Sequence, residues 1–283
     1  MGKKIVITAG PTNERIDSVM QITNMSTGAL GTVMAEAFAD YAEAHPGAID
    51  AIYYLSPKLA VKPKPHAGLV TYVNVTDADS LLKALTCVLT EEDVDAVVHN
   101  AAVGDYKAKY SVRGEDLAEE IAKVILNMPY GTSGLTRENV YDAVLRVLDD
   151  PKCAADDSGK MSSYEPHLMT MMALTPKVIG QIKKLAPHAL LIGSKLLDGV
   201  SQQELFDVAS RLRGKNDADY VIANDLSRIG HGAHPAMIVG YDNFQERDVV
   251  VAECGNKDEI ARAVVRLVLG EDLPVAEART EKG

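Results

Sequence analysis

The sequence has few cysteines and no long apolar run, which excludes several classes of protein. Cys87, Cys153 and Cys254 are odd in number and too widely spaced for a disulfide framework or a zinc site. We interpret them as reduced thiols. No apolar run approaches the length of a membrane-spanning helix, and no long apolar stretch follows the N-terminus as in a secretory signal. We therefore expect a soluble, cytoplasmic protein with no membrane partner.

Positive charge is also scarce. The chain has 29 Lys and Arg residues against 40 Asp and Glu, a formal net charge of -11. A global attraction to nucleic acid or to an anionic membrane is therefore not expected. If the ligand is a phosphate ester, the positive potential must be local, from helix N-termini, backbone amides and a few lysines or arginines.

Short apolar runs alternate with helical patterns through most of the 283 residues. Such alternation predicts an α/β fold: a three-layer, Rossmann-like, mostly parallel sheet with helices on both faces. We expect a single nucleotide-binding α/β domain over 1–283, with a helical insertion at about 107–159. The expected strands are 4–8, 51–55, 69–73, 95–99, 168–174, 189–192, 219–223, 236–240 and 248–252. The expected helices are 27–42, 77–90, 115–123, 137–148, one after Pro176, 201–212 and 257–269.

The loop after the first strand lacks the compact G-x-G-x-x-G turn of a plain dinucleotide-binding fold. In its place, Ser26, Gly28 and Gly31 open a helix. A serine or threonine can cap that helix, and glycines let a phosphate approach the exposed amides. A capped helix with a glycine packed on the sheet explains the same residues without a ligand, so both interpretations stay open at this point.

Other polar residues follow later strands. Asn100 to Asp105 follow the fourth strand, where small residues leave space for a ligand and Asp105 can accept hydrogen bonds; turn formation is the alternative. Lys160 stands beside hydroxyls, as a phosphate partner or as a solvated lysine. Lys215 lies near a helix end, where a cation also complements the dipole. The histidines form no convincing metal-ligand spacing, and no nucleophile elbow supports a Ser-His-Asp triad.

Several motifs taken together resemble those of phosphopantothenate–cysteine ligases, in their stand-alone bacterial form. The motifs occur in the family's order. The segments that carry the resemblance are 8–17, 22–31, 101–106, 160–163, 174–178, 191–197 and 215–225.

The resemblance implies a two-step ligase reaction of coenzyme A biosynthesis. The carboxylate of 4′-phosphopantothenate attacks the α-phosphate of a nucleoside triphosphate, CTP rather than ATP in most bacterial members, and pyrophosphate leaves. The amine of L-cysteine then attacks the acyl-nucleotidylate and releases the nucleoside monophosphate. The resemblance also implies Mg²⁺ bound mainly through nucleotide phosphates, no protein metal cage, and a homodimer.

The same resemblance assigns roles to individual residues. Asn24 matches the asparagine that binds the substrate and the acyl intermediate, and Lys160 matches the lysine of nucleotidyl transfer; both are candidate catalytic residues. Ala101, Ala102 and Asp105 match the substrate-binding turn. The candidate nucleotide-binding residues are Gly10, Ser26, Gly28, Gly31, Ser194, Lys215 and Asn224.

The sequence departs from the family pattern at three places. Ser194 stands where many relatives have an aromatic residue after the glycine. Met20 stands where relatives commonly have an arginine that reaches a neighbouring subunit's substrate phosphate, for which Arg15 is a candidate replacement. The insertion before Lys160 is long relative to that of the fused enzymes.

Two other functions compete with the ligase. Asn100-Ala-Ala resembles a motif of NAD(P)-dependent short-chain dehydrogenases, but their Tyr-x-x-x-Lys pattern has its candidate at Tyr54 and Lys58, where Pro57 disfavours a helix. A nucleotide-sensing protein without catalysis is the third possibility, suggested by Met20 and Ser194.

Overall fold

The computed structural model describes residues 2–128, 135–154 and 166–273. The chain divides into two compact units. The first comprises Met1–Thr12, Asn24–Val103 and Pro176–Gly283, and the second comprises Asn13–Thr23 and Gly104–Thr175.

An eight-stranded sheet forms the centre of the first unit. Its order is β12-β11-β10-β9-β6-β1-β4-β5. All neighbours are parallel except at β11, which runs antiparallel to both β10 and β12. The strands are β1 (Lys3–Thr8), β4 (Ile49–Pro57), β5 (Val70–Val75), β6 (Ala96–His99), β9 (Leu190–Leu197), β10 (Tyr220–Asp225), β11 (Ala236–Asp242) and β12 (Arg247–Cys254).

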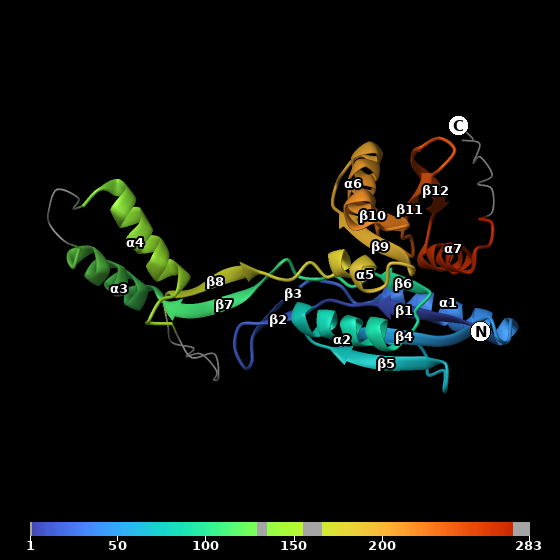
Figure 1. The fold of residues 1–283 in the computed structure, drawn as a ribbon, viewed down its shortest axis with the longest axis horizontal. Coiled ribbons are helices and arrows are strands. Elements are labelled where there is room, and N and C mark those ends of the chain that lie inside the picture. The colour runs from blue at the N-terminus through green and yellow to red at the C-terminus, as the bar shows by residue number, and fades with distance from the viewer. Residues whose placement is uncertain (1, 129–134, 155–165, 274–283) are drawn as a thin grey trace. The chain divides into compact units, whose positions relative to one another are not determined.

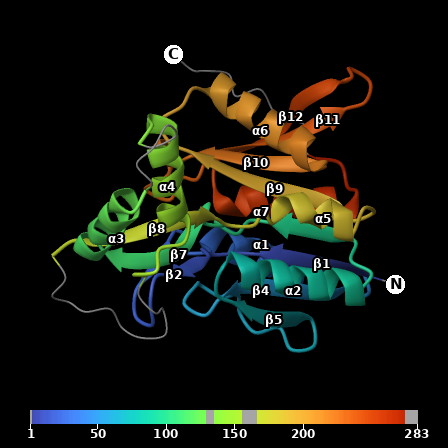
Figure 2. The ribbon, with the colours of Figure 1, turned by 60° about the vertical axis from the view of Figure 1, so that its left-hand side comes forward.

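Five helices cover the two faces of this sheet (Figures 1 and 2). On one face lie α1 (Ala29–Ala44) and α7 (Lys257–Leu269), and on the other lie α2 (Ala78–Glu91), α5 (Ile179–Leu185) and α6 (Gln202–Asn216). The predicted three-layer α/β fold is confirmed. None of the described helices has both the length and the apolarity needed to cross a membrane.

The central strands are apolar on both sides because both sides are covered. In β1, Ile5 and Ile7 pack toward α1 and α7, while Val6 packs toward α2, and all three are fully buried. Adjacent residues of a strand point to opposite faces. The continuous apolar runs of the sequence are therefore the signature of a doubly covered sheet.

The second unit contains two small sheets and two helices. β2 (Asn13–Arg15) pairs with β3 (Gln21–Thr23), and β7 (Tyr106–Arg113) pairs with β8 (Leu168–Leu174), both antiparallel. Helices α3 (Gly114–Leu126) and α4 (Arg137–Asp149) pack on the second pair. The buried side chains of this small core are Tyr110, Val112, Leu117 and Val147.

The predicted insertion, 107–159, coincides with part of this second unit. Its two helices are present as expected, but β7 is an additional strand that pairs with β8, beyond the predicted end of the insertion. A single strand is not stable without a partner strand. Because β7 pairs with β8, the second unit extends to the end of β8 at Leu174. That the chain folds as a single domain over 1–283 stays a prediction.

Three glycines allow α1 to begin close to the end of β1. Gly10 and Gly28 both have φ of +79°, and a β-carbon on Gly28 would lie 3.1 Å from the Gly10 nitrogen. A β-carbon on Gly31 would lie 2.5 Å from the β-carbon of Ala9. Larger residues at these positions would push the helix away from the strand.

This packing predicts opposite effects for two helical glycines. Gly31→Ala should lower the free energy of unfolding by about 1–3 kcal/mol, because the added methyl collides with Ala9. Gly214→Ala is the matched control: Gly214 lies in α6 with nothing within 4 Å of its β-carbon position. There the better helix propensity of alanine should raise stability by about 0.5–1 kcal/mol. Denaturant titration measures both, and equal effects would contradict the packing argument.

Candidate functional site

Two loops meet at the carboxyl ends of β1 and β6. The amide of Asn100 donates to the Thr8 carbonyl at 3.1 Å, and the amide of Ala102 donates to the Gly10 carbonyl at 2.9 Å. The Thr12 amide in turn donates to the Ala102 carbonyl at 3.2 Å. Ligands of parallel α/β sheets bind beyond these strand ends. The structure therefore brings Gly10, Ala101 and Ala102 together at the expected edge.

Asn24 is attached to the same loop. Its side-chain amide donates from Nδ2 to the Ala102 carbonyl at 3.0 Å, although 78 positions separate the two residues. Asn24 itself is exposed at the surface. This bond holds the candidate catalytic amide beside the candidate substrate-binding turn.

The start of α1 differs from the expected serine or threonine cap. Gly28 is the N-cap residue and has no side chain, and the Thr27 hydroxyl accepts a hydrogen bond from the Ala29 amide at 3.3 Å. The Ser26 hydroxyl accepts a hydrogen bond from the Gly28 amide at 3.4 Å. The N-cap position is therefore held by Gly28 with its positive φ, and a threonine one residue earlier supplies an acceptor for the first amide of the helix.

The other long helices of the first unit are capped by their own side chains. Asp77, Ser201 and Asn256 accept hydrogen bonds from the first turns of α2, α6 and α7 respectively. The first amides of a helix need acceptors, and the helix dipole favours an anion there. At α1 the N-cap residue is a glycine, and a helix start of this kind is a common binding position for phosphate.

A row of polar side chains crosses the sheet from this helix start. Asn100, Ser194 and Asn224 follow the buried residues Val98, Ile192 and Ile222, which face α1 and α7. Alternation along each strand therefore puts these three polar residues on that same face. The Ser194 hydroxyl donates to Asn100 Oδ1 at 2.9 Å. We call these three residues, together with His234, the polar row.

His234 completes the row beyond the end of β10. Nδ2 of the buried Asn224 lies 2.7 Å from His234 Nε2. Because an amide nitrogen only donates, Nε2 must accept, and the neutral ring carries its proton on Nδ1. Burial lowers the pKa of His234, which favours the neutral ring. Nδ1 is buried and has no hydrogen-bond partner among the described residues, an arrangement that costs about 1–3 kcal/mol.

His99 and Thr8 support the loop from the opposite face of the sheet. The Thr8 hydroxyl lies 2.9 Å from His99 Nδ1 and accepts a hydrogen bond from the Ala101 amide at 3.1 Å. Both side chains are buried, and burial lowers the pKa of His99 from 6.5 to about 4. His99 is therefore neutral at physiological pH and stabilises the turn rather than attracting an anion.

Three predicted site residues lie outside the group described above. Asp105 is exposed and belongs to the second unit, while Lys160 lies outside the described residues. Lys215 is in the last turn of α6, which leads into the amino end of β10, whereas Asn224 lies at its carboxyl end. The length of β10, about 20 Å, separates them.

Met20 lies between β2 and β3, in the second unit. Arg15 pairs with Gln21 across the two short strands, and Met20 has 42% of its surface exposed. Asp17 Oδ1 accepts hydrogen bonds from the amides of Val19 and Met20, each at 2.6 Å, which shapes the turn. Whether Arg15 replaces the family's arginine stays a prediction.

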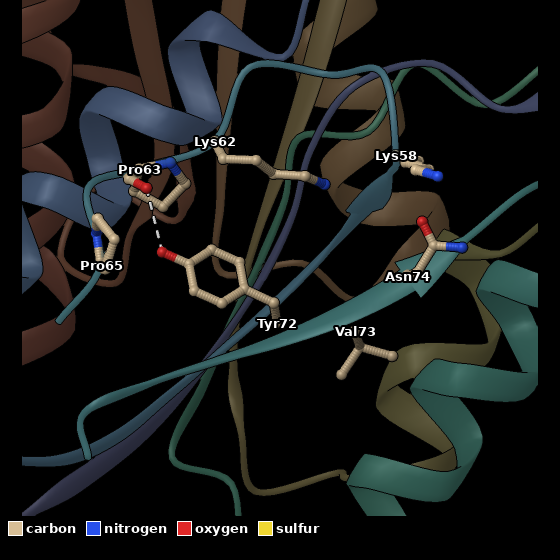
Figure 3. Close-up of a pocket in the computed structure, with 7 residues that line it drawn as sticks. All are labelled: Lys58, Lys62, Pro63, Pro65, Tyr72, Val73 and Asn74. Carbon is tan, nitrogen blue, oxygen red and sulfur yellow. Dashed lines mark hydrogen bonds between the residues drawn. The ribbon is translucent and has the colours of Figure 1, made fainter. Parts of the chain in front are cut away.

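A separate cavity of about 360 Å³ lies at the carboxyl ends of β4 and β5 (Figure 3). Its Lys62 ammonium donates to the Ser56 hydroxyl and to the Pro57 carbonyl, while the Tyr72 hydroxyl donates to the Pro63 carbonyl at 3.1 Å. These bonds attach the loop after β4 to the sheet. No predicted site residue lines this cavity, so we assign it no part in the site.

The Tyr-x-x-x-Lys pattern of short-chain dehydrogenases, which has its candidate at Tyr54 and Lys58, does not lie on a helix. Tyr54 is fully buried in β4, and its hydroxyl donates to the Val61 carbonyl at 3.3 Å. A tyrosine that serves as a catalytic acid must reach a substrate. Tyr54 and Lys58 therefore do not form the expected catalytic pair.

The fold is that of an α/β protein with a mostly parallel sheet, a class whose ligands bind beyond the carboxyl ends of the strands. Residues 1–125 match the family described as DNA/pantothenate metabolism flavoprotein C-terminal domain. This match agrees with the family resemblance that the sequence motifs indicate.

Relatives of known name extend this similarity. The coenzyme A biosynthesis bifunctional protein CoaBC of Thermococcus kodakarensis is 26% identical over 241 residues, which cover 85% of this chain and 46% of that protein. The chain thus spans about half the length of this relative. The crystal structure of the DNA/pantothenate metabolism flavoprotein from Streptococcus pneumoniae has a TM-score of 0.72 and 26% identity, and covers 95% of this chain and 99% of that one.

A more distant structure has the same fold. It is a Cab2 mutant in complex with phosphopantothenate-cysteine, with a TM-score of 0.57 and 14% identity, covering 95% of this chain and 88% of that one. At this identity the similarity concerns the fold alone.

The burial of His99 predicts a pH dependence of stability. An unfolded histidine takes up a proton as the pH falls below 6.5, whereas folded His99 does so only near pH 4. The unfolded state therefore binds more protons between these values, and stability falls with pH by up to about 3 kcal/mol. His99→Asn, which keeps a partner for Thr8 without titrating, should flatten this acid limb in denaturant titrations. An unchanged slope in the variant would exclude His99 as its origin.

Proposed function

We propose that this protein is a phosphopantothenate–cysteine ligase of coenzyme A biosynthesis. It joins 4′-phosphopantothenate to L-cysteine through an acyl-nucleotidylate. The observation that carries the proposal is the attachment of Asn24 to the Ala102 loop beside the glycine-capped start of α1. The match of residues 1–125 to the flavoprotein C-terminal domain family and the similarity to CoaBC support it.

The chemistry explains why a nucleotide and a carboxylate must meet at one edge of the sheet. A carboxylate resists attack by an amine because it is anionic and has no leaving group. Attack of its oxygen on the α-phosphate expels pyrophosphate and forms a mixed anhydride. The cysteine amine then attacks the acyl carbon, loses a proton, and displaces the nucleoside monophosphate. Both steps depend on positioning and on hydrogen bonds that stabilise the developing charge.

The residues of the first unit take distinct roles in this proposal. The first turn of α1, with Gly28 and Gly31, binds the triphosphate through backbone amides. Asn24 donates to the acyl oxygen as that oxygen gains negative charge. The polar row binds the rest of the nucleotide, with Asn224 as a direct contact.

Other assignments rest on the family resemblance. Lys160 would offset charge on the α-phosphate and Asp105 would bind the substrate, whereas Lys215, at the amino end of β10, takes no part in the proposed site. The described residues contain no group of three or more His, Cys, Asp or Glu side chains suited to a metal ion. A Mg²⁺ held mainly by phosphate oxygens and water fits this set of residues. CTP as the preferred nucleotide, a homodimer and a cytoplasmic location are parts of the same proposal.

Pyrophosphate release tests the proposal directly. The purified protein is assayed with CTP, ATP, GTP and UTP, each with and without 4′-phosphopantothenate and cysteine. A ligase releases pyrophosphate only when phosphopantothenate is present, and makes phosphopantothenoylcysteine once cysteine is added. Nucleotide binding without pyrophosphate would indicate a sensor, and hydride transfer to a nicotinamide would indicate a dehydrogenase.

Removal of the Asn24 amide should slow the reaction. Asn24→Ala loses a donor to the transition state, and removal of such a donor typically lowers kcat by about 10²-fold. The acyl-nucleotidylate should then accumulate or escape, which mass spectrometry of quenched reactions detects. Asn243→Ala is the matched control, because Asn243 is an exposed asparagine in the turn between β11 and β12. Wild-type rates for both half-reactions in Asn24→Ala would refute the assigned role.

A further inference from the structure

The two asparagines of the polar row are held in opposite orientations by their neighbours. Ser194 donates to Asn100 Oδ1 at 2.9 Å, so the oxygen of that amide is engaged and its nitrogen lies on the other edge. Asn100 Nδ2 lies 3.6 Å from the point where a β-carbon on Gly31 would be. The amino group of Asn100 is therefore close to the first turn of α1.

At Asn224 it is the amide nitrogen, not the oxygen, that faces the neighbouring side chain. Asn224 Nδ2 faces His234 Nε2 at 2.7 Å, so Oδ1 occupies the edge of the amide opposite His234. The register of β10 and β11 pairs Asn224 with Ala236, which places His234 beyond the strand end on the β11 side. The backbone amide of His234 donates to the Gly255 carbonyl at 2.8 Å, which fixes the residue at the end of β12.

The two ends of the polar row therefore differ: one end offers hydrogen-bond donors and the other offers an acceptor. At the α1 end, backbone amides and the Asn100 amino group offer hydrogen-bond donors, which suit phosphate oxygens. At the β10 end, Asn224 offers an acceptor, which suits a ligand group that donates. A nucleoside triphosphate has both, with acceptors on its phosphates and donors on its ribose hydroxyls or exocyclic amine.

We propose that His234 is a positioning residue that sets the orientation of Asn224, so that Oδ1 accepts a hydrogen bond from a donor group of the nucleoside. This inference rests on the proposed function, because it takes the ligand of the row to be the nucleoside triphosphate. Ser194 has the corresponding task at Asn100. At the position of Ser194 many relatives have an aromatic residue, so the serine here orients the Asn100 amide where an aromatic ring would pack against the base.

His234→Ala tests the proposal in a nucleotide panel. CTP and UTP differ in the exocyclic amine, and CTP is compared with its 2′-deoxy and 3′-deoxy forms for the ribose hydroxyls. Wild type should prefer the nucleotide that carries the bound donor by about tenfold in KM and in Kd, as expected for one hydrogen bond. His234→Ala frees the Asn224 amide to rotate, and the preference in Kd should fall below about threefold.

Two further variants separate orientation from general damage. His234→Gln keeps an acceptor near the position of Nε2 and should restore the preference. Ser194→Ala acts at the end of the polar row that offers donors. It should therefore weaken the binding of all triphosphates by a similar factor and leave the preference among the nucleotides unchanged. If His234→Ala does not fold, as judged by circular dichroism, His234→Leu fills the same volume without an acceptor and replaces it.

The outcomes separate this inference from the proposed function. Calorimetric Kd values need no turnover, so the His234 comparison holds even if wild type releases no pyrophosphate, a result that would defeat the ligase alone. A preference that His234→Ala leaves intact would overturn the positioning role. So would a wild type that binds all four nucleotides equally.

Discussion

The close approach of α1 to the end of β1 is the constraint on which the rest of the site depends. A β-carbon on Gly28 would lie 3.1 Å from the Gly10 nitrogen, and Gly31 lies against Ala9 with no room for a methyl group. This contact places the first amides of α1 beside Asn100 and the Ala102 loop. Without it, the helix start, the Asn24 amide and the polar row would not lie at one edge of the sheet.

The candidate site has no accumulation of basic side chains in its described part. The chain has a net charge of -11, and the donors at the start of α1 are backbone amides and neutral side chains. Such donors are fixed by the fold, so they need little reorganisation when charge develops on a phosphate or an acyl oxygen. Their direction depends on their neighbours: Ser194 and His234 turn two identical asparagine side chains in opposite senses.

The sequence predicted the sheet well because its strands are short apolar runs buried on both faces. The strands at β1, β6, β9 and β10 and the helices between them lie where their patterns indicated. The motifs also identified Asn24, Gly28, Ala102 and Asn224 before their positions were known. These predictions depend on local patterns or on family motifs, which one sequence displays directly.

Contacts between distant segments were beyond the reach of the sequence. The pairing of β7 with β8 joins residues about sixty positions apart, across two predicted helices. His234 drew attention only as an unconvincing metal ligand, because the register of β10 and β11 is what brings it to Asn224. Asn100 was noted for its motif, yet its orientation depends on Ser194, which is 94 positions away. Hydrogen-bond partners at such separations leave no periodic signal.

A crystal structure of the protein with CTP and phosphopantothenate tests the central claim most directly. We predict that the triphosphate lies on the first turn of α1, next to Asn100, and that the nucleoside extends along the polar row to Asn224. The phosphopantothenate carboxylate should lie between the α-phosphate and Asn24. A nucleotide bound in the reverse direction, or bound away from the carboxyl ends of β1, β6, β9 and β10, would contradict the account.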